Sequence, residues 1–270
     1  MKQAFQSPSG ILLALILAIA FIGPLLPLAD PLAMDVAARF GGPSAAHPLG
    51  QDEYGRDLLS RLVHALRSAI LISGGAAMIS AVIGVSVGVV AGYVRGFSEA
   101  LSMRVMDVIL CFPPLLLAML AATLYGAGPS TLVPVLALVF VPSFTRVAHA
   151  SVMTVRGQDY VDATRLMGAS ATRIIFRTIL PNIVGPLFVQ FSFVVVMSVI
   201  LESGLSFLGL GVLPPQPSLG MMIGTARSTF AQEPWLLLAP CLSLIVLVLV
   251  LNAFCDHLRQ LFDPRRESGA

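Results

Sequence analysis

Gly84, Ser86 and Gly88 form a G-x-S-x-G pattern, which in hydrolases places a serine nucleophile on a turn between a strand and a helix. Here the pattern lies inside a long apolar stretch, where such a turn is not expected. Gly84, Gly88 and Gly92 also recur every fourth residue, a spacing that lets two helices pack closely. We therefore predict helix packing at this motif, and not catalysis.

Two other kinds of chemistry are excluded by residue type. The four histidines, His47, His64, His149 and His257, show no metal-ligand spacing, and no H-E-x-x-H motif occurs. Lys2 is the only lysine, whereas a phosphate-binding loop of the G-x-x-x-x-G-K-[ST] type needs a lysine within the chain. The sequence therefore predicts no catalytic, cofactor-binding or metal-binding residue, and the chain alone is not expected to be an enzyme.

Composition places the chain in a membrane. Hydrophobic residues make up 57% of the sequence, charged residues only 11%, and mean hydropathy is +0.90. Soluble domains carry about 25% charged residues. The net charge of +2 gives no reason to expect nucleic acid as a partner.

Six apolar stretches approach the length of about 20 residues that crosses a bilayer: Ile11–Leu28, Ala69–Tyr93, Val105–Tyr125, Leu132–Ala148, Ile183–Leu213 and Trp235–Phe254. We therefore predict an all-α integral membrane protein with six spans, the third kinked at Pro113-Pro114.

Two acidic residues lie within these spans, where an unpaired charge is costly. Asp107 follows Arg104 by three residues, and this spacing predicts an ion pair on one helix face. Glu202 lies deeper, in the fifth span. Two roles stay open for it: the side chain faces a translocation pathway or gate, or it hydrogen-bonds a neighbouring span.

The distribution of arginine predicts the orientation, because cytoplasmic loops of membrane proteins are enriched in Lys and Arg. The segment after the fourth span carries four arginines against two acids: Arg156, Arg165, Arg173 and Arg177, with Asp159 and Asp162. This segment is therefore expected to be cytoplasmic, and with six spans both termini are cytoplasmic as well. The first span is expected to stay in the protein as a helix rather than to be a cleaved signal peptide, since no clear cleavage site follows it.

The segment Asp57–Arg67 has amphipathic spacing, with leucines on one face and Ser60, Arg61 and His64 on the other. It is expected either to lie in the membrane interface or to pack on a partner subunit. The chain divides into residues 1–68, with the first span and a periplasmic amphipathic segment, a core membrane domain of residues 69–256, and a cytoplasmic tail of residues 257–270.

The most informative stretch, residues 160–182, joins the fourth and fifth spans. Small or apolar residues recur there at helical spacing: Val161, Ala163, Met167 and Ala171. Gly168 interrupts the pattern, and a second apolar run continues to Leu180-Pro181, where proline disfavours helix at the preceding residue. We predict a helix, a glycine turn, a second helix and a proline stop. An amphipathic hairpin of this kind needs a protein to dock on. The alternative, a plain connecting loop, would not need the pattern.

This stretch resembles the EAA loop of ATP-binding-cassette (ABC) importer permeases, in which E-A-A is followed by glycine and then by L-P. Asp162-Ala163-Thr164, Gly168 and Leu180-Pro181 match it, with Asp in place of Glu and Thr in place of the second Ala. The resemblance implies that loop 156–182 couples the spans to an ATPase subunit, and that Asp162, Ala163, Thr164, Gly168, Leu180 and Pro181 belong to this contact.

Three further segments extend the resemblance to nearly the whole chain: residues 47–61 (H-P-L-G-Q-D-E-Y-G-R-D-L-L-S-R), residues 202–211 (E-S-G-L-S-F-L-G-L-G), and Asn252, Asp256 and Asp263-Pro264-Arg265 near the end. Together they resemble the second, C-type permease subunit of dipeptide, oligopeptide and nickel importers. Gln51, His149, Cys255 and Gln260 depart from that pattern.

The resemblance implies a type I importer permease fold, MetI-like, in a bacterial inner membrane. Expected partners are a second homologous permease, one or two ABC ATPase subunits that bind ATP and Mg²⁺, a periplasmic or lipid-anchored substrate-binding protein, and membrane lipid. The substrate, whether peptide, nickel chelate or another small solute, is left open. Two other classes of membrane protein would share this composition. A stand-alone secondary transporter usually shows an internal repeat, and none is visible. An intramembrane enzyme would need paired catalytic groups within the spans.

Overall fold

The computed structural model describes residues 7–262 of the chain. Regular structure in that range is helical, apart from one isolated bridge between Gln51 and Asp57. The elements are α2 (Pro8–Ile22), η1 (Gly23–Leu25), η2 (Val36–Ala38), α3 (Leu58–Val94), α4 (Phe97–Leu110), α5 (Pro114–Tyr125), α6 (Pro129–Arg156), α7 (Asp159–Leu166), α8 (Ala171–Ile174), the π-helical segment η3 (Ile175–Ile179), α9 (Leu180–Phe207), α10 (Leu219–Ala226), η4 (Arg227–Thr229) and α11 (Pro234–Leu261).

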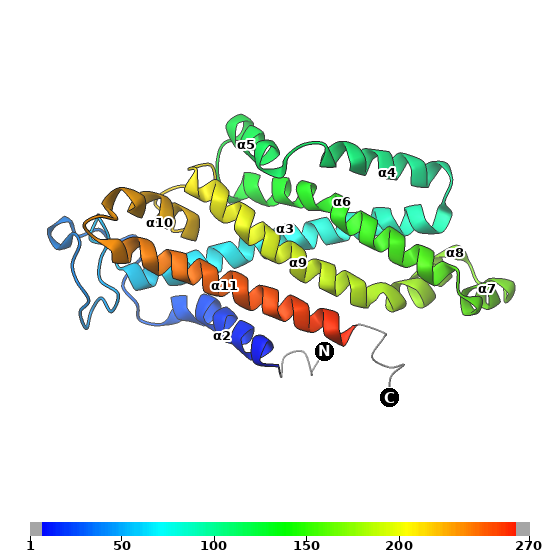
Figure 1. Ribbon diagram of the computed structural model, residues 1–270, viewed down its shortest axis with the longest axis horizontal. Coiled ribbons are helices and arrows are strands. Elements are labelled where there is room, and N and C mark those ends of the chain that lie inside the picture. Colours follow the sequence, from blue (N-terminus) through cyan, green and yellow to red (C-terminus); the bar gives the residue numbers. More distant parts are fainter. Residues whose placement is uncertain (1–6, 263–270) are drawn as a thin grey trace.

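The molecule is an elongated helical bundle (Figure 1). Helices α3, α6, α9 and α11 run along its long axis, and α2 packs beside α11. The short helices α7 and α8 lie at one end of the bundle, and α10 lies at the other end with the loop that precedes α3. The start of α2 and the end of α11 point toward the end that carries α7.

The all-helical membrane fold is confirmed, and five of the six predicted spans are single helical stretches. Five helical stretches within residues 7–262 are each long and apolar enough to cross a membrane. The predicted third span corresponds to α4 and α5, which meet at 80° across a short break and pass the length and hydropathy test only as a pair. Pro114 is the first residue of α5, where its missing N–H costs no hydrogen bond, so Pro113-Pro114 produces the predicted kink. The span begins earlier than predicted, at Phe97.

Helix α3 overturns the expectation for Asp57–Arg67. The helix runs without a break through 37 residues, about 55 Å at 1.5 Å per residue, and this segment forms its first turns. The side that was expected to meet water or a partner is buried within the chain, since Ser60 is 0% and Arg61 is 2% exposed. Periodicity did not reveal this because the loop before α3 folds back and supplies Asp52 to Arg61.

Glycine lets α3 and α6 approach closely. A Cβ atom added to Gly84 would lie 2.6 Å from Cβ of Phe144, and one added to Gly88 would lie 2.8 Å from Cβ of Ala148. Gly92 faces Val152 in the same way, one turn further along α6. The prediction that these glycines serve helix packing is therefore confirmed, and the G-x-S-x-G pattern is part of a helix–helix contact.

The outer faces of the long helices carry exposed, large apolar side chains. They include Leu71, Val82, Leu116, Leu124, Leu238 and Leu249. In water such a surface would be an aggregation site, whereas hydrocarbon chains can cover it. The predicted tail of residues 257–270 begins as the last turn of α11, and Asp263-Pro264-Arg265 lies outside the described residues, as does Lys2.

Candidate functional site

The hairpin at residues 159–174 contains the predicted glycine turn. Gly168 follows α7 with φ at +77°, a left-handed conformation that glycine adopts without strain. Its N–H donates to the carbonyl of Arg165 at 3.0 Å, and the N–H of Ala169 donates to the carbonyl of Thr164 at 3.4 Å. This pair of bonds is a Schellman motif, which satisfies carbonyls at the end of α7. The chain then reverses into α8, as the sequence predicted.

The first three residues of the EAA-like pattern lie on α7 and do not enter the core. Asp162 is exposed and pairs with Arg165, Oδ1 to Nη1 at 2.9 Å. Ala163 is exposed, and Thr164 donates its hydroxyl to the carbonyl of Tyr160 at 2.7 Å. All three thus form local contacts only, and α7 presents its Asp162–Ala163 surface to the outside.

One side of the hairpin is anchored firmly in the bundle. Val161 of α7 is fully buried, as are Ile174 and Ile179 on the other arm. They pack in one cluster with Val89 of α3 and Val152 of α6. Burying side chains of this size contributes roughly 1.5–3 kcal/mol each. The hairpin is therefore a rigid extension of three spans, α3, α6 and α9.

Two large apolar residues at the tip of the hairpin have no such cover. Leu166 is 89% and Met167 is 87% exposed, next to Gly168. The sequence pattern grouped Met167 with Val161 on one apolar face, but α7 ends at Leu166 and the turn carries Met167 outward. Helical spacing therefore could not reveal this exposed tip, since it arises where the helix stops.

Leu180 and Pro181 do not stop a helix, so this expectation was wrong. Helix continues from Ala171 to Phe207 through the π-helical segment η3. In that segment the N–H of Leu180 bonds to the carbonyl of Ile175, five residues back. Pro181 has no N–H to donate, and the wider π turn accommodates its ring where a regular α turn would be broken. Leu180 joins the anchoring cluster, and Pro181 is exposed.

Asp107 is paired, but not with Arg104. Its Oδ1 lies 2.7 Å from Nη2 of Arg146 on α6. A second pair lies near the start of α4, where Glu99 Oε1 is 2.8 Å from Nε2 of His149. The two pairs attach α4 to α6. Local spacing favoured Arg104, whereas the packing of α4 against α6 brings a partner from 39 residues away.

Glu202 is fully buried in α9, with 0% of its surface exposed. Ser206 donates its hydroxyl to Oε1 at 2.7 Å, and Ser203 donates to Oε2 at 3.4 Å. The Ser206 hydroxyl also accepts from the N–H of Val212 at 3.2 Å. These partners lie on the same helix or in the turn after it. These bonds tie the end of α9 to Val212, and the pathway or gate role of Glu202 stays a prediction.

The loop before α3 holds a network of buried charges at the end opposite α7. Arg56 donates from Nε to Oδ2 of Asp52 at 2.7 Å, and Nε of Arg61 lies 3.4 Å from the same oxygen. Asp57 caps the first turn of α3 and lies 3.0 Å from Nδ1 of His47. These charged residues of the 47–61 motif are thus satisfied inside the chain, where they fix the loop on α3.

Sequence relatives agree with this architecture. The chain matches the family described as "Binding-protein-dependent transport system inner membrane component" over residues 84–268. A putative peptide transport system permease protein of Brucella suis biovar 1 is 36% identical over 264 residues, which cover 98% of this chain and 88% of the relative. The di/tripeptide transport system permease protein DppC of Pseudomonas aeruginosa is 38% identical over 229 residues, 85% of this chain and 76% of the relative.

Solved structures show the same fold. The MetNI methionine ABC transporter in inward-facing conformations contains a chain that matches with a TM-score of 0.62 at 16% identity, covering 75% of this chain and 97% of that one. An amino acid ABC transporter with histidines matches with a TM-score of 0.54 at 14% identity, with coverage of 75% and 94%. The named sequence relatives favour a permease subunit of an ABC importer over a stand-alone secondary transporter. The chain belongs to the binding-protein-dependent transport system inner membrane component family, the multi-pass permease subunits of ABC importers.

Proposed function

We propose that the chain forms half of a translocation pathway for peptides or related small solutes, and that loop 156–182 couples it to ATPase subunits. The exposed tip of the hairpin carries the coupling proposal. Leu166 and Met167 are almost wholly exposed, and they lie outside the segments that are long and apolar enough to cross a membrane, next to α7 at one end of the bundle (Figure 1). Burying both against a groove would contribute roughly 3–6 kcal/mol, enough to hold a partner.

The anchoring of the hairpin supports a coupling role over a plain connection. A loop that only joined α6 to α9 would not need Val161, Ile174 and Ile179 to be buried among residues of α3 and α6. With this packing, a displacement of α7 moves the ends of three spans together, because close-packed interiors transmit strain. A partner that pulls on the tip therefore acts on the spans directly.

Orientation follows from the arginines around the hairpin and from the direction of the helices. Arg156, Arg165, Arg173 and Arg177 gather at the α7 end, which favours the cytoplasm. The start of α2 and the end of α11 point to this same end, so both termini are assigned to the cytoplasm (Figure 1). The loop with the Asp52 network then lies on the periplasmic side.

The complex we infer contains a second homologous permease, one or two ABC ATPase subunits, and a periplasmic or lipid-anchored binding protein in a bacterial inner membrane. ATP and Mg²⁺ belong to the ATPase subunits. The names of relatives support a peptide substrate, since one is a di/tripeptide permease and a glutathione permease of Pectobacterium atrosepticum is 34% identical over 99% of this chain. We therefore infer a short peptide as the transported solute.

The coupling proposal is tested by removing the apolar tip. We expect Leu166→Ser with Met167→Ser to lower recovery of the ATPase subunits with a tagged permease by about tenfold or more, since the lost burial exceeds about 1.4 kcal/mol. Val36→Ser is the control, because Val36 is 69% exposed and belongs to the loop that precedes α3, at the end of the bundle opposite α7 (Figure 1). A cysteine at Ala163 should also crosslink to the ATPase. Unchanged recovery and no adduct would show that the loop only connects two spans.

A further inference from the structure

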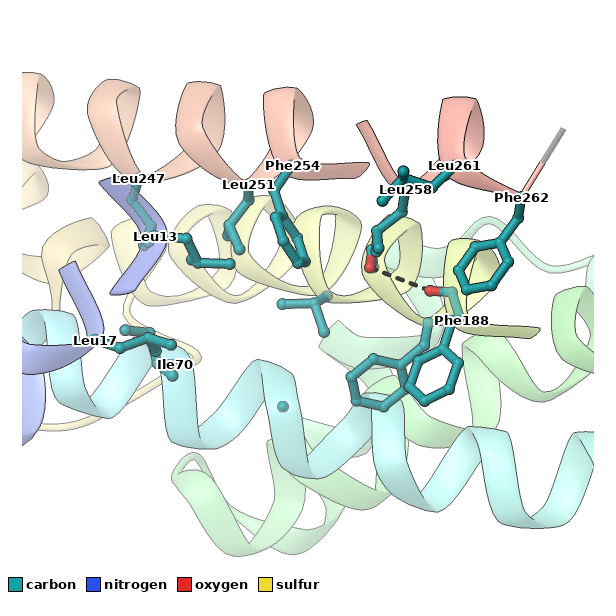
Figure 2. A pocket seen from close by; sticks show the side chains of 14 residues that line it. Leu13, Leu17, Ile70, Phe188, Leu247, Leu251, Phe254, Leu258, Leu261 and Phe262 are labelled. Carbon is teal, nitrogen blue, oxygen red and sulfur yellow. Dashed lines mark hydrogen bonds between the residues drawn. The ribbon is translucent and has the colours of Figure 1, made fainter. Parts of the chain in front are cut away.

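An apolar cavity of about 470 Å³ lies between four helices that are distant in sequence. Figure 2 shows its walls, with Leu13 and Leu17 from α2, Ile70 from α3, Phe188 from α9, and a row of residues from α11. It is about three times as large as an engineered cavity of about 150 Å³ that stays dry and binds benzene. A space of this size in the span region needs an apolar occupant.

The cavity offers no free polar group. Ser192 is the one polar side chain among the described residues that line it, and its hydroxyl donates to the carbonyl of Phe188 at 3.1 Å, shown as the dashed line in Figure 2. Water needs two or more polar partners to be held in a cavity, and a peptide needs partners for every amide. The cavity therefore does not suit the transported solute.

The dimensions suit a single hydrocarbon chain. Along α11 the lining extends from Leu247 to Phe262, about 22 Å at 1.5 Å per residue. One leaflet of a hydrocarbon core about 30 Å thick is about 15 Å deep, so an acyl chain fits within this length. Helix α2 contributes Leu13 and Leu17 to the lining, and Leu13 lies near Leu251 (Figure 2). At the other end of the row, Leu261 and Phe262 are each 40% exposed. A chain can enter from the bilayer at this end.

A positive charge lies beside the Phe262 end. Arg259 is exposed and lines an adjoining groove together with Phe262 and Gln190. No ion pair or hydrogen bond occupies its guanidinium within residues 7–262. Basic side chains between spans at a membrane surface attract anionic lipid headgroups. We propose that the cavity binds an acyl chain of an anionic phospholipid, from the leaflet at the α7 end, with its headgroup at Arg259.

Gly74 provides the first test, because it lines the cavity and a Cβ built on it meets no atom within 4 Å. Gly74→Leu should fill the space without disturbing the backbone. The assembled complex is purified in mild detergent, and native mass spectrometry counts the phospholipids that stay bound. We expect Gly74→Leu to lower the amount of bound phospholipid by about tenfold. This corresponds to losing about 1.4 kcal/mol of apolar burial between the acyl chain and the cavity. Gly204→Leu is the matched control, since its Cβ is equally free and it lines a separate groove of α9, α10 and α11.

Arg259 provides the second test, because it should select the headgroup. We expect Arg259→Gln to retain phospholipid but to lose the preference for anionic over zwitterionic lipid in vesicles that contain both. Arg227→Gln should keep the preference, because Arg227 directly follows α10, which lies at the opposite end of the bundle (Figure 1). The proposal is overturned if the unaltered complex holds no lipid or only zwitterionic lipid, or if Gly74→Leu retains as much as Gly204→Leu. A crosslink from a cysteine at Leu261 to the second permease would also overturn it, because a helix would then fill the cavity.

Discussion

Gly168 offers the sharpest test of the coupling hairpin. Its φ of +77° is costly for other residues, by about 1–2 kcal/mol in general, but asparagine enters this region more readily than β-branched residues do. A Cβ at this position meets nothing within 4 Å, so neither substitution clashes within the chain. Gly168→Val and Gly168→Asn therefore differ mainly in the turn that they allow, and they form a matched pair.

The expected effect follows from this difference. A cost of about 1–2 kcal/mol weakens the Schellman turn against its alternatives by a factor of about 5–30. Leu166 and Met167 then leave the orientation that the turn gives them. We expect Gly168→Val to reduce both ATPase recovery and uptake of a labelled dipeptide, with uptake normalised to the amount of permease in the membrane. Gly168→Asn should keep most of both activities.

The pair also separates two physical reasons for the glycine. If both variants lose coupling, the ATPase approaches so closely that any side chain is excluded, and the turn is only part of the requirement. Gly168→Asp, which adds charge as well as bulk, should then abolish transport while the permease stays inserted. The reasoning would be refuted if Gly168→Val, at normal abundance in the membrane, recovered the ATPase subunits and took up dipeptide as well as the unaltered permease does. The left-handed turn would then not be needed for coupling.

Three further predictions concern topology, energy and packing. A cysteine at Ala169 should react with a membrane-impermeant reagent only from the cytoplasm, and reaction from outside intact cells would reverse the assigned orientation. The purified chain, free of partners, should not hydrolyse ATP, because it has no lysine for a phosphate-binding loop; any activity that co-purifies with the chain itself would contradict this. Gly88→Leu should lower thermal stability in detergent through about 1–3 kcal/mol of overpacking against Ala148, whereas Gly74→Leu should not.

The spans and the hairpin turn could be read from sequence because each rests on a local rule. A run of about 20 apolar residues crosses the bilayer whatever surrounds it. Pro113-Pro114 interrupts a helix through its own covalent geometry, and Gly168 allows a left-handed turn for the same kind of reason. These features need no knowledge of which helices are neighbours.

The partners of the charged residues could not be read in this way. Asp107 had an acceptable local partner in Arg104, and only the packing of α4 on α6 selects Arg146. Arg61 looked exposed on a helical wheel, but the loop before α3 covers it with Asp52. In each case the ion-pair partner is decided by which helices and loops pack together. A single sequence does not show which of several possible partners is brought close.

The misread proline bears on mechanism. Because Leu180-Pro181 does not break the chain's helical path, the segment Ala171–Phe207 runs as one 37-residue helix from the hairpin to the far side of the bundle. Its first residues pack in the cluster that anchors α7, and its last turn is tied to Val212 through Glu202 and Ser206. The π-helical segment lies near the start of this path, and Pro186 lies further along it inside α9. A helix that is held at both ends moves as a unit. A displacement of α7 is therefore expected to displace the helix end near residue 212 as well. For that reason Glu202, which is fully buried in the chain, is expected to matter for coupling through the helix whose end it holds.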